Sequence, residues 1–295
     1  MTRFLAIFGD SLMDSGNLDQ VANIVGRDPF REKIYNGSGN VRASDALVLG
    51  QHIAKGLGAS LRSTRLANLV TLPLLRLTGF GSRQIRDFSY AGATSGARGS
   101  ARSGLSRFSI GLKEQARGFA LSTGKTSDLD ALISAGSNDI TDLAVDVKGL
   151  RPVLATSTLK DDRRLRDSVA RRIVNNVADA HDAITGLVDE TVILGLAPLS
   201  VTPFVRSQAS RLNAPLRDRF TGLVDGIAQS VNQGLANRFA GRSNVLVVDG
   251  FQVWQSVSSP VFLDDIHPTS ATAQQLAGAV VGLIKDSHLD SFGFA

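Results

Sequence analysis

Near the start of the chain stands FLAIFGDSL, residues 4–12, an apolar run that ends in a polar turn. Residues 4–8 show no alternation of polar and apolar side chains, which favours a strand buried on both faces of a parallel sheet. Ser11 then follows the carboxyl end of that strand, where open α/β sheets bind their ligands. The same residues also fit an ordinary turn in which Asp10 or Ser11 caps a helix. Ser11 is therefore a candidate nucleophile that needs support from elsewhere in the chain.

The support comes from the other end of the chain, which reads DDIHP at residues 264–268. A histidine that follows an acid at this spacing supplies the base and the orienting carboxylate that a nucleophilic serine needs. We expect His267 to be the base and Asp264 the orienting acid, and we expect Asp265 to be replaceable. In the alternative interpretation both acids are solvated loop residues, and His267 only precedes a helix that Pro268 starts.

Two further segments end strand-like runs with glycine, FSYAGAT at residues 88–94 and AGSND at residues 135–139. Acyl transfer needs preorganised donors that face the oxygen that becomes negative. The backbone N–H of Gly92 and the side-chain amide of Asn138 are suitable donors. Taken singly, each residue also fits a plain turn position.

These segments occur in the order of the four blocks of the GDSL-type serine hydrolases of the SGNH superfamily, which the chain resembles. Its opening FGDSLMDSGN, residues 8–17, is similar to the branch that includes plant GDSL esterases and lipases and bacterial secreted esterases and phospholipases. The likeness extends from about residue 3 to about residue 285. The chain departs from the branch at Asp87, where Asn is usual, which leaves the anchoring of that loop open.

The resemblance implies a three-layer α/β/α fold around a five-stranded parallel sheet with flavodoxin-like order, the SGNH hydrolase fold. It also implies Ser11 as nucleophile, His267 as base and Asp264 as orienting acid. The oxyanion hole would consist of the Ser11 and Gly92 N–H groups and the Asn138 side chain. The sequence contains no Gly-x-Ser-x-Gly, which argues against an α/β-hydrolase with its nucleophile elbow.

Hydrophobic periodicity agrees with an alternation of strands and helices. The expected strands are residues 4–8, 85–90, 129–134, 191–196 and 244–248. Apolar positions at helical spacing predict helix faces at residues 165–177 and 212–235, with Asn213 as a cap and Pro215 in the first turn. No linker or repeat divides the chain, so we expect a single domain over residues 1–295.

Composition excludes several classes of protein and site. The chain is 43% hydrophobic and 20% charged, which suits a folded domain with a sizeable core. The net charge is +5, but the basic residues are spread among acids, which indicates solvated helix faces and no nucleic-acid partner. Cysteine is absent, which excludes disulfides and thiolate metal sites. The histidines lack partners at ligand spacing, so we expect no metal and no organic cofactor.

The N-terminal apolar run of five residues is too short for a signal peptide, so we expect either a protein that stays inside the cell or a mature, trimmed form of a secreted one. Residues 268–284 contain Thr, Ser and Gln and predict an amphipathic helix, not a transmembrane segment. Residues 66–80 fit a lid or a connector packed on the core, and residues 97–107 fit a mobile segment that either gates the site or binds nothing. Trp254 fits the cleft or the core, and His52, His181 and His288 fit surface or ordinary core positions.

Together these observations predict a serine ester hydrolase that cleaves short to medium acyl esters through an acyl-enzyme. The substrate would be a small-molecule, lipid or glycan ester. A glycan O-acetylesterase, a phospholipase or an acyltransferase with the same three residues is the enzymatic alternative. A catalytically silent binding module with this fold is a further alternative, because a fold alone does not establish activity.

Overall fold

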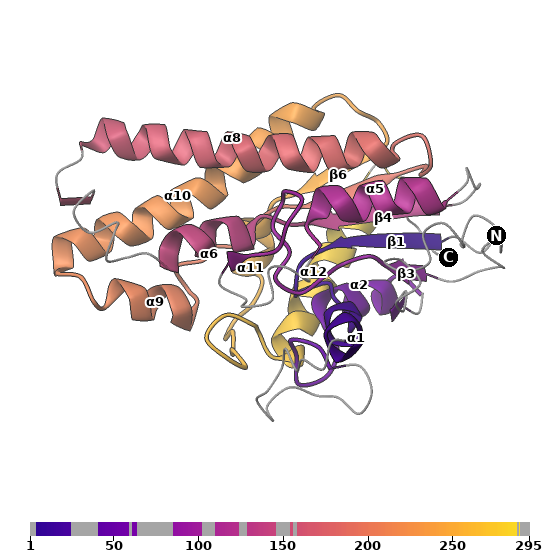
Figure 1. Cartoon of the computed structure of the whole chain (residues 1–295), viewed down its shortest axis with the longest axis horizontal. Coiled ribbons are helices and arrows are strands. Elements are labelled where there is room, and N and C mark those ends of the chain that lie inside the picture. Colours follow the sequence, from indigo (N-terminus) through magenta and orange to yellow (C-terminus); the bar gives the residue numbers. More distant parts are fainter. Residues whose placement is uncertain are drawn as a thin grey trace.

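The computed structural model describes residues 4–24, 41–58, 61–63, 85–101, 110–123, 129–145, 154–155, 158–287 and 289. Its centre is a parallel sheet whose described strands lie in the order β2-β3-β1-β4-β5-β6. They are β1 (Phe4–Gly9), β2 (Leu61–Ser63), β3 (Ile85–Asp87), β4 (Leu129–Ser134), β5 (Thr191–Leu194) and β6 (Val245–Val248). Helices cover both faces of the sheet, which confirms the three-layer α/β/α prediction (Figure 1).

Two groups of helices form the outer layers. One group contains α5 (Leu112–Ser122), α6 (Ser137–Val145), α8 (Leu159–Ile184), α9 (Pro203–Ala209) and α10 (Ala214–Phe239). The other contains α2 (Leu49–Gly56), α11 (Gly250–Gln255) and α12 (Ser270–Lys285). Helix α1 (Asn17–Ile24) lies beside α2 in Figure 1.

The sheet separates two apolar cores, because alternate side chains of a strand reach opposite faces. On β1, Ala6 and Phe8 pack into the core under α5, α8 and α10. Leu5 and Ile7 pack into the core under α2 and α12. Burying a side chain such as Phe8 contributes roughly 1.5–3 kcal/mol to stability. Burial on both faces explains why the run at residues 4–8 lacks polar alternation.

The predicted five-stranded parallel order is present in the sheet. Without the three-residue edge strand β2, the order β3-β1-β4-β5-β6 is the flavodoxin-like order. All five predicted strands occur, and β2 adds a short sixth at the edge. β3 and β5 end earlier than predicted, at Asp87 and Leu194, because the chain leaves the sheet there to form loops. β1 and β4 flank the point where the strand order reverses, which is where such sheets bind ligands.

The predicted helix faces are also present. Val169, Ile173 and Val177 of α8 are buried in the first core. Asn213 caps α10, since its side-chain oxygen accepts from the Leu216 N–H. The amphipathic helix predicted near the C-terminal end is α12.

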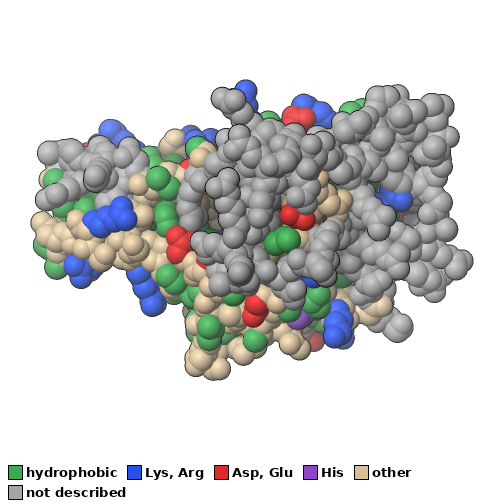
Figure 2. Space-filling view, turned by 60° about the horizontal axis from the view of Figure 1, so that its bottom comes forward, with side chains coloured by type: hydrophobic (Ala, Val, Ile, Leu, Met, Phe, Trp, Pro, Cys, Tyr) green, Lys and Arg blue, Asp and Glu red, His purple; other side chains and the backbone are tan. Residues whose placement is uncertain are grey.

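Among the described residues, no helix has the length and apolar character needed to cross a membrane. On the face of the molecule seen in Figure 2, Lys and Arg side chains are separated by other side chains. Some arginines of α10 pair with acids of α8 at the surface, as Arg238 does with Asp182 at 3.5 Å. This pairing agrees with the predicted solvated helix faces. Residues 66–80, predicted as a lid or a connector, and residues 102–107 of the predicted mobile segment lie outside the described residues.

Candidate active site

The turn that carries Ser11 follows the last residue of β1. Gly9 ends the strand, and the Gln115 side-chain amide bonds its N–H and its carbonyl, at 2.9 and 2.8 Å. A Cβ atom on Gly9 would lie 2.3 Å from the Ser134 carbonyl oxygen of β4. Only glycine therefore allows the two strand ends to approach this closely. Ser11 is left at the carboxyl edge of the sheet, 8% exposed.

Three side chains form a hydrogen-bonded chain at this edge. His267 Nε2 lies 2.8 Å from Ser11 Oγ, and His267 Nδ1 lies 2.6 Å from Asp264 Oδ2. The His267 and Asp264 side chains are 18% and 11% exposed, so water screens their interaction only weakly. The structure thus brings together the three residues predicted as nucleophile, base and acid, although Ser11 and His267 are 256 positions apart.

The loop that carries His267 is held by hydrogen bonds between its own residues. Asp264 Oδ1 accepts from the N–H groups of Ile266 and His267, at 2.7 and 2.6 Å. The Leu263 N–H donates to the His267 carbonyl at 2.7 Å. Asp265 is exposed, and its backbone carbonyl accepts from the N–H of Phe204, the second residue of α9. Asp264, and not Asp265, therefore holds the imidazole in the structure, as the sequence predicts.

Two of the predicted oxyanion donors, Gly92 and Asn138, lie on one turn and on the helix beside it. Gly92 has φ +78°, a conformation that favours glycine. Asn138 Nδ2, at the start of α6, donates to the carbonyl of the neighbouring Ala93 at 2.9 Å. One N–H of that amide remains, because a primary amide has two. Across the described ranges, neither the Ser11 N–H nor the Gly92 N–H donates a hydrogen bond.

Four buried aspartates surround these groups, and burial raises the pKa of each. The pKa of Asp10 rises to about 6, because desolvation outweighs the Leu12 N–H bond and the nearby His267. The pKa of Asp87 rises to about 7 through burial and the adjacent Asp14. Burial likewise raises the pKa of Asp14 and of Asp139. The site is therefore surrounded by carboxyl groups whose ionised form is disfavoured by burial in the protein interior.

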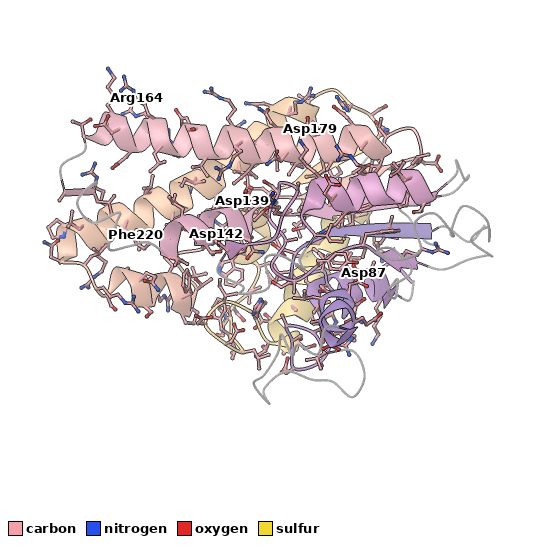
Figure 3. The ribbon with its side chains drawn as sticks, viewed as in Figure 1. Asp87, Asp139, Asp142, Arg164, Asp179 and Phe220 are labelled. Carbon is pink, nitrogen blue, oxygen red and sulfur yellow. The ribbon has the colours of Figure 1, made fainter. Side chains whose placement is uncertain are left out.

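The sequence left open whether the loop at Asp87 is anchored. The carboxylate of Asp87, which is labelled in Figure 3, anchors it through hydrogen bonds to Ser15 and Ser89. Asp87 Oδ2 accepts from Ser15 N and Ser15 Oγ, both at 2.6 Å, and Oδ1 accepts from Ser89 N at 2.8 Å. The side chain is fully buried. Asp87 thus connects the segment after Ser11 to the segment that leads to Gly92.

Sequence reasoning did not identify the supporting roles of Asp14 and Asp139. Asp14 accepts the N–H groups at the start of α1 and also the Ala91 N–H, at 2.7 Å. Asp139 accepts from Ser95 N at 2.7 Å. The available signal was the position of both acids, one in the turn after Ser11 and one beside Asn138, each close to a strand end. Their partners, however, lie far along the chain.

Other residues considered from the sequence lie in ordinary surroundings. Trp254 is half-buried and packs against the second core, with its ring 5.9 Å from that of Phe262. His181 is buried and meets Phe239 edge-on at 5.0 Å, while His52 Nε2 lies 2.9 Å from Ser270 Oγ. In the part of the chain that the structure describes, no three His, Cys, Asp or Glu residues gather to hold a metal ion. His288 lies outside the described residues.

This arrangement is suited to nucleophilic attack on a carbonyl carbon. Ser11 Oγ can pass its proton to His267 Nε2, while Asp264 keeps the other ring nitrogen protonated. Backbone N–H groups and a side-chain amide are the kinds of donor that stabilise a carbonyl oxygen as it becomes negative.

Comparisons with known proteins agree with this chemistry. The model of the family described as GDSL-like lipase/acylhydrolase matches residues 5–280. No curated protein sequence matches the chain.

Solved structures give a more distant likeness. A member of the lipolytic protein G-D-S-L family from Veillonella parvula DSM 2008 is 10% identical, with a TM-score of 0.44 over 96% of this chain and 98% of the other. Axe2, an acetylxylan esterase from Geobacillus stearothermophilus, is 15% identical, with a TM-score of 0.42 over 98% and 97% of the two chains. The family assignment rests on the match over residues 5–280, not on these weak likenesses.

Proposed function

The chain belongs to the GDSL-like lipase/acylhydrolase family and is therefore an ester-hydrolysing enzyme, and from this premise we propose that it is a serine esterase for short to medium acyl esters. Ser11 forms the acyl-enzyme, His267 is the base and Asp264 orients the imidazole. The observation that carries the proposal is the chain of hydrogen bonds from Ser11 Oγ through His267 to Asp264, at 2.8 and 2.6 Å.

In the first half of the proposed reaction, Ser11 Oγ attacks the ester carbonyl carbon and His267 Nε2 takes the hydroxyl proton. The negative carbonyl oxygen accepts from the Ser11 and Gly92 N–H groups and from the Asn138 amide. His267 then returns the proton to the leaving alcohol, and the acyl group remains on Ser11.

In the second half, His267 takes a proton from water, which attacks the acyl carbon. A second tetrahedral intermediate forms, and its negative oxygen accepts from the same three donors. It collapses to the carboxylic acid as His267 returns the proton to Ser11 Oγ. Asp264 stays ionised throughout and stabilises the imidazolium at Nδ1. An alcohol in place of water would make the same site an acyltransferase.

The test is hydrolysis of p-nitrophenyl esters from acetate to palmitate by the wild-type enzyme and by Ser11→Ala. We expect the highest kcat/KM at short to medium chains and loss of activity in the variant, with an unchanged melting temperature because a turn hydroxyl contributes little to the core. A fluorophosphonate should label the wild type at Ser11. Retention of most turnover by Ser11→Ala would refute the assignment.

Parallel assays distinguish the related enzymes that share this chemistry. Acetylated polysaccharide and phospholipid, tested beside the p-nitrophenyl esters, separate a carboxylesterase from a glycan O-acetylesterase and a phospholipase. A high kcat/KM on either of these substrates, well above that on the simple esters, would replace the proposed substrate class and keep the chemistry at Ser11. A wild-type protein that is folded, unlabelled and inactive on every ester would instead indicate a silent binding module.

The proposed reaction needs no metal, because both ring nitrogens of His267 are already engaged by Ser11 and Asp264. Activity should therefore survive exhaustive treatment with EDTA, measured on p-nitrophenyl acetate after removal of the chelator. Loss of activity that zinc or calcium restores would contradict this part of the proposal.

A further inference from the structure

The turn at residues 91–95 is held at both ends by buried carboxylates. At its start, the Ala91 N–H donates to Asp14 Oδ2 at 2.7 Å. At its end, Ser95 N donates to Asp139 Oδ2 at 2.7 Å, and Ser95 Oγ donates to Asp139 Oδ1 at 3.0 Å. Gly92 lies between these two anchors, so the direction of its N–H depends on both.

The second anchor also controls the other proposed oxyanion donor. Asp139 follows Asn138 directly in the first turn of α6 (Figure 3). The Asn138 amide donates to Ala93 in the middle of the turn at 2.9 Å. Asn176 of α8 donates to Ser95 Oγ at 3.0 Å and holds the same end from the far side. The turn and the start of α6 are thus joined as one unit.

We infer that Asp139 is a positioning residue, which fixes the Gly92 N–H and the Asn138 amide relative to each other so that both reach the same oxyanion. The inference rests on the proposed function, because it concerns the donors named there. The contribution of Asp139 is geometric, since a negative charge so close to an oxyanion would oppose it. Hydrogen bonds to a carboxylate are short and strong. Breaking them would leave a buried carboxylate without partners, which costs free energy, so Asp139 is well suited to hold the turn.

Asp139→Ala tests the inference because it removes both bonds to Ser95. Loss of one oxyanion donor costs about 10²- to 10³-fold in kcat, and a displacement of about 1 Å can cost about 10²-fold. Since the donors remain present but less well placed, we expect kcat to fall about 10- to 100-fold. KM should stay within about twofold, because the donors act mainly on the transition state.

Asp139→Asn separates geometry from charge. Its amide oxygen can accept from Ser95 N, and its amide N–H can donate to Ser95 Oγ, which then acts as acceptor. Both links to the turn are kept while the charge is removed. We therefore expect Asp139→Asn to retain at least about a third of the wild-type kcat, which a requirement for the carboxylate charge would not allow.

Asp225→Ala is the matched control. Asp225 Oδ1 accepts from the N–H groups of Leu199 and Ser200, at 3.0 and 2.9 Å, and Oδ2 accepts from Ser200 Oγ at 2.5 Å. The set of contacts resembles that of Asp139 but serves a different loop. We expect a lower melting temperature, because buried hydrogen bonds are lost, and a kcat per folded molecule within about threefold of wild type, because these bonds do not hold the turn at residues 91–95.

The experiment measures kcat and KM on p-nitrophenyl acetate, with thermal melts to count folded protein. A kcat of Asp139→Ala within threefold of wild type, or an equal loss in Asp139→Asn, overturns the inference. If Asp139→Ala does not fold, Ser95→Ala replaces it, with an expected loss of about 3- to 10-fold because only the hydroxyl link is removed; no loss overturns the inference. If Ser11→Ala keeps its activity, the proposed function fails instead.

Discussion

The two halves of the candidate site are built in different ways. The half that carries His267 is local: Asp264 bonds the imidazole and two backbone N–H groups within the same short loop. The half that carries Ser11 is non-local, since Asp87 and Asp139 join segments that lie 72 and 44 positions apart. The base is therefore oriented by a self-contained loop, whereas the nucleophile and the oxyanion donors depend on the whole fold.

The halves also differ in burial and charge. On the Ser11 side, Asp10, Asp14 and Asp87 are almost completely buried, and burial raises the pKa of each. On the His267 side, the imidazole is partly exposed and Asp265 is open to solvent. The buried carboxyl groups of the Ser11 half should consequently control stability and its dependence on pH, whereas Asp264 of the His267 half should affect turnover with little effect on stability.

Apart from replacement of the nucleophile, the largest expected effect lies in the local half, at Asp264→Asn. Asn keeps the oxygen that accepts from Ile266 and His267, but its amide N–H faces His267 Nδ1 and forces the other tautomer. His267 Nε2 then carries a proton and cannot accept one from Ser11. We expect kcat on p-nitrophenyl acetate to fall by about 10⁴-fold with little change in melting temperature.

Asp265→Asn is the control for that substitution, since its side chain is exposed and next in sequence. We expect its kcat to stay within about twofold of wild type, as for most surface substitutions. A larger loss at Asp265 than at Asp264 would reverse the assignment of the orienting acid.

The same contrast explains what the sequence could predict. Asp264 and His267 are three positions apart, so their pairing leaves a local pattern, and the apolar runs of the sheet do so as well. The three residues of β2 are too few to show a period. The sequence does not show the roles of Asp14 and Asp139, because their partners in the turn at residues 91–95 lie 77 and 44 positions away. Only the folded chain shows these carboxylates beside their partners.

The next largest effect is expected in the non-local half, at Asn138→Ala. If the amide donates to the oxyanion, kcat should fall by roughly 10²- to 10³-fold while KM stays nearly unchanged. The bond from Asn138 to Ala93 is also lost, so the melting temperature should fall slightly. The measurement is steady-state kinetics on the folded fraction, paired with a thermal melt.

A purely structural Asn138 would give a different pattern. The protein would be less stable, but kcat per folded molecule would stay close to that of the wild type. Such a result would remove Asn138 from the oxyanion hole and leave the two backbone N–H groups of Ser11 and Gly92 as its donors.

The smallest expected effect is on stability, and it tests whether the Ser11 half controls the pH dependence. Burial and the adjacent Asp14 raise the pKa of Asp87 from 3.8 to about 7 in the folded state. A group with a raised folded pKa contributes stability below its unfolded pKa and loses it as pH rises through the folded value. Ionising Asp87 in the folded protein should therefore cost on the order of 2–4 kcal/mol between pH 4 and pH 8.

Asp87→Asn removes that titration, so the comparison to make is the difference in unfolding free energy between variant and wild type at pH 5 and at pH 8. Asn has one acceptor oxygen fewer, so a hydrogen bond from Ser15 or Ser89 is lost, which changes the unfolding free energy of the variant by the same amount at every pH. The variant also lacks the ionisation of Asp87, which makes it more stable relative to the wild type at pH 8 than at pH 5. Asp161→Asn is the control, because hydrogen bonds from Thr158 lower the pKa of Asp161 and place its titration below this range. Its difference should be flat from pH 5 to pH 8. A flat difference for Asp87→Asn as well would show that Asp87 is ionised throughout this range, and the buried carboxyl groups beside Ser11 would then not be the source of the pH dependence.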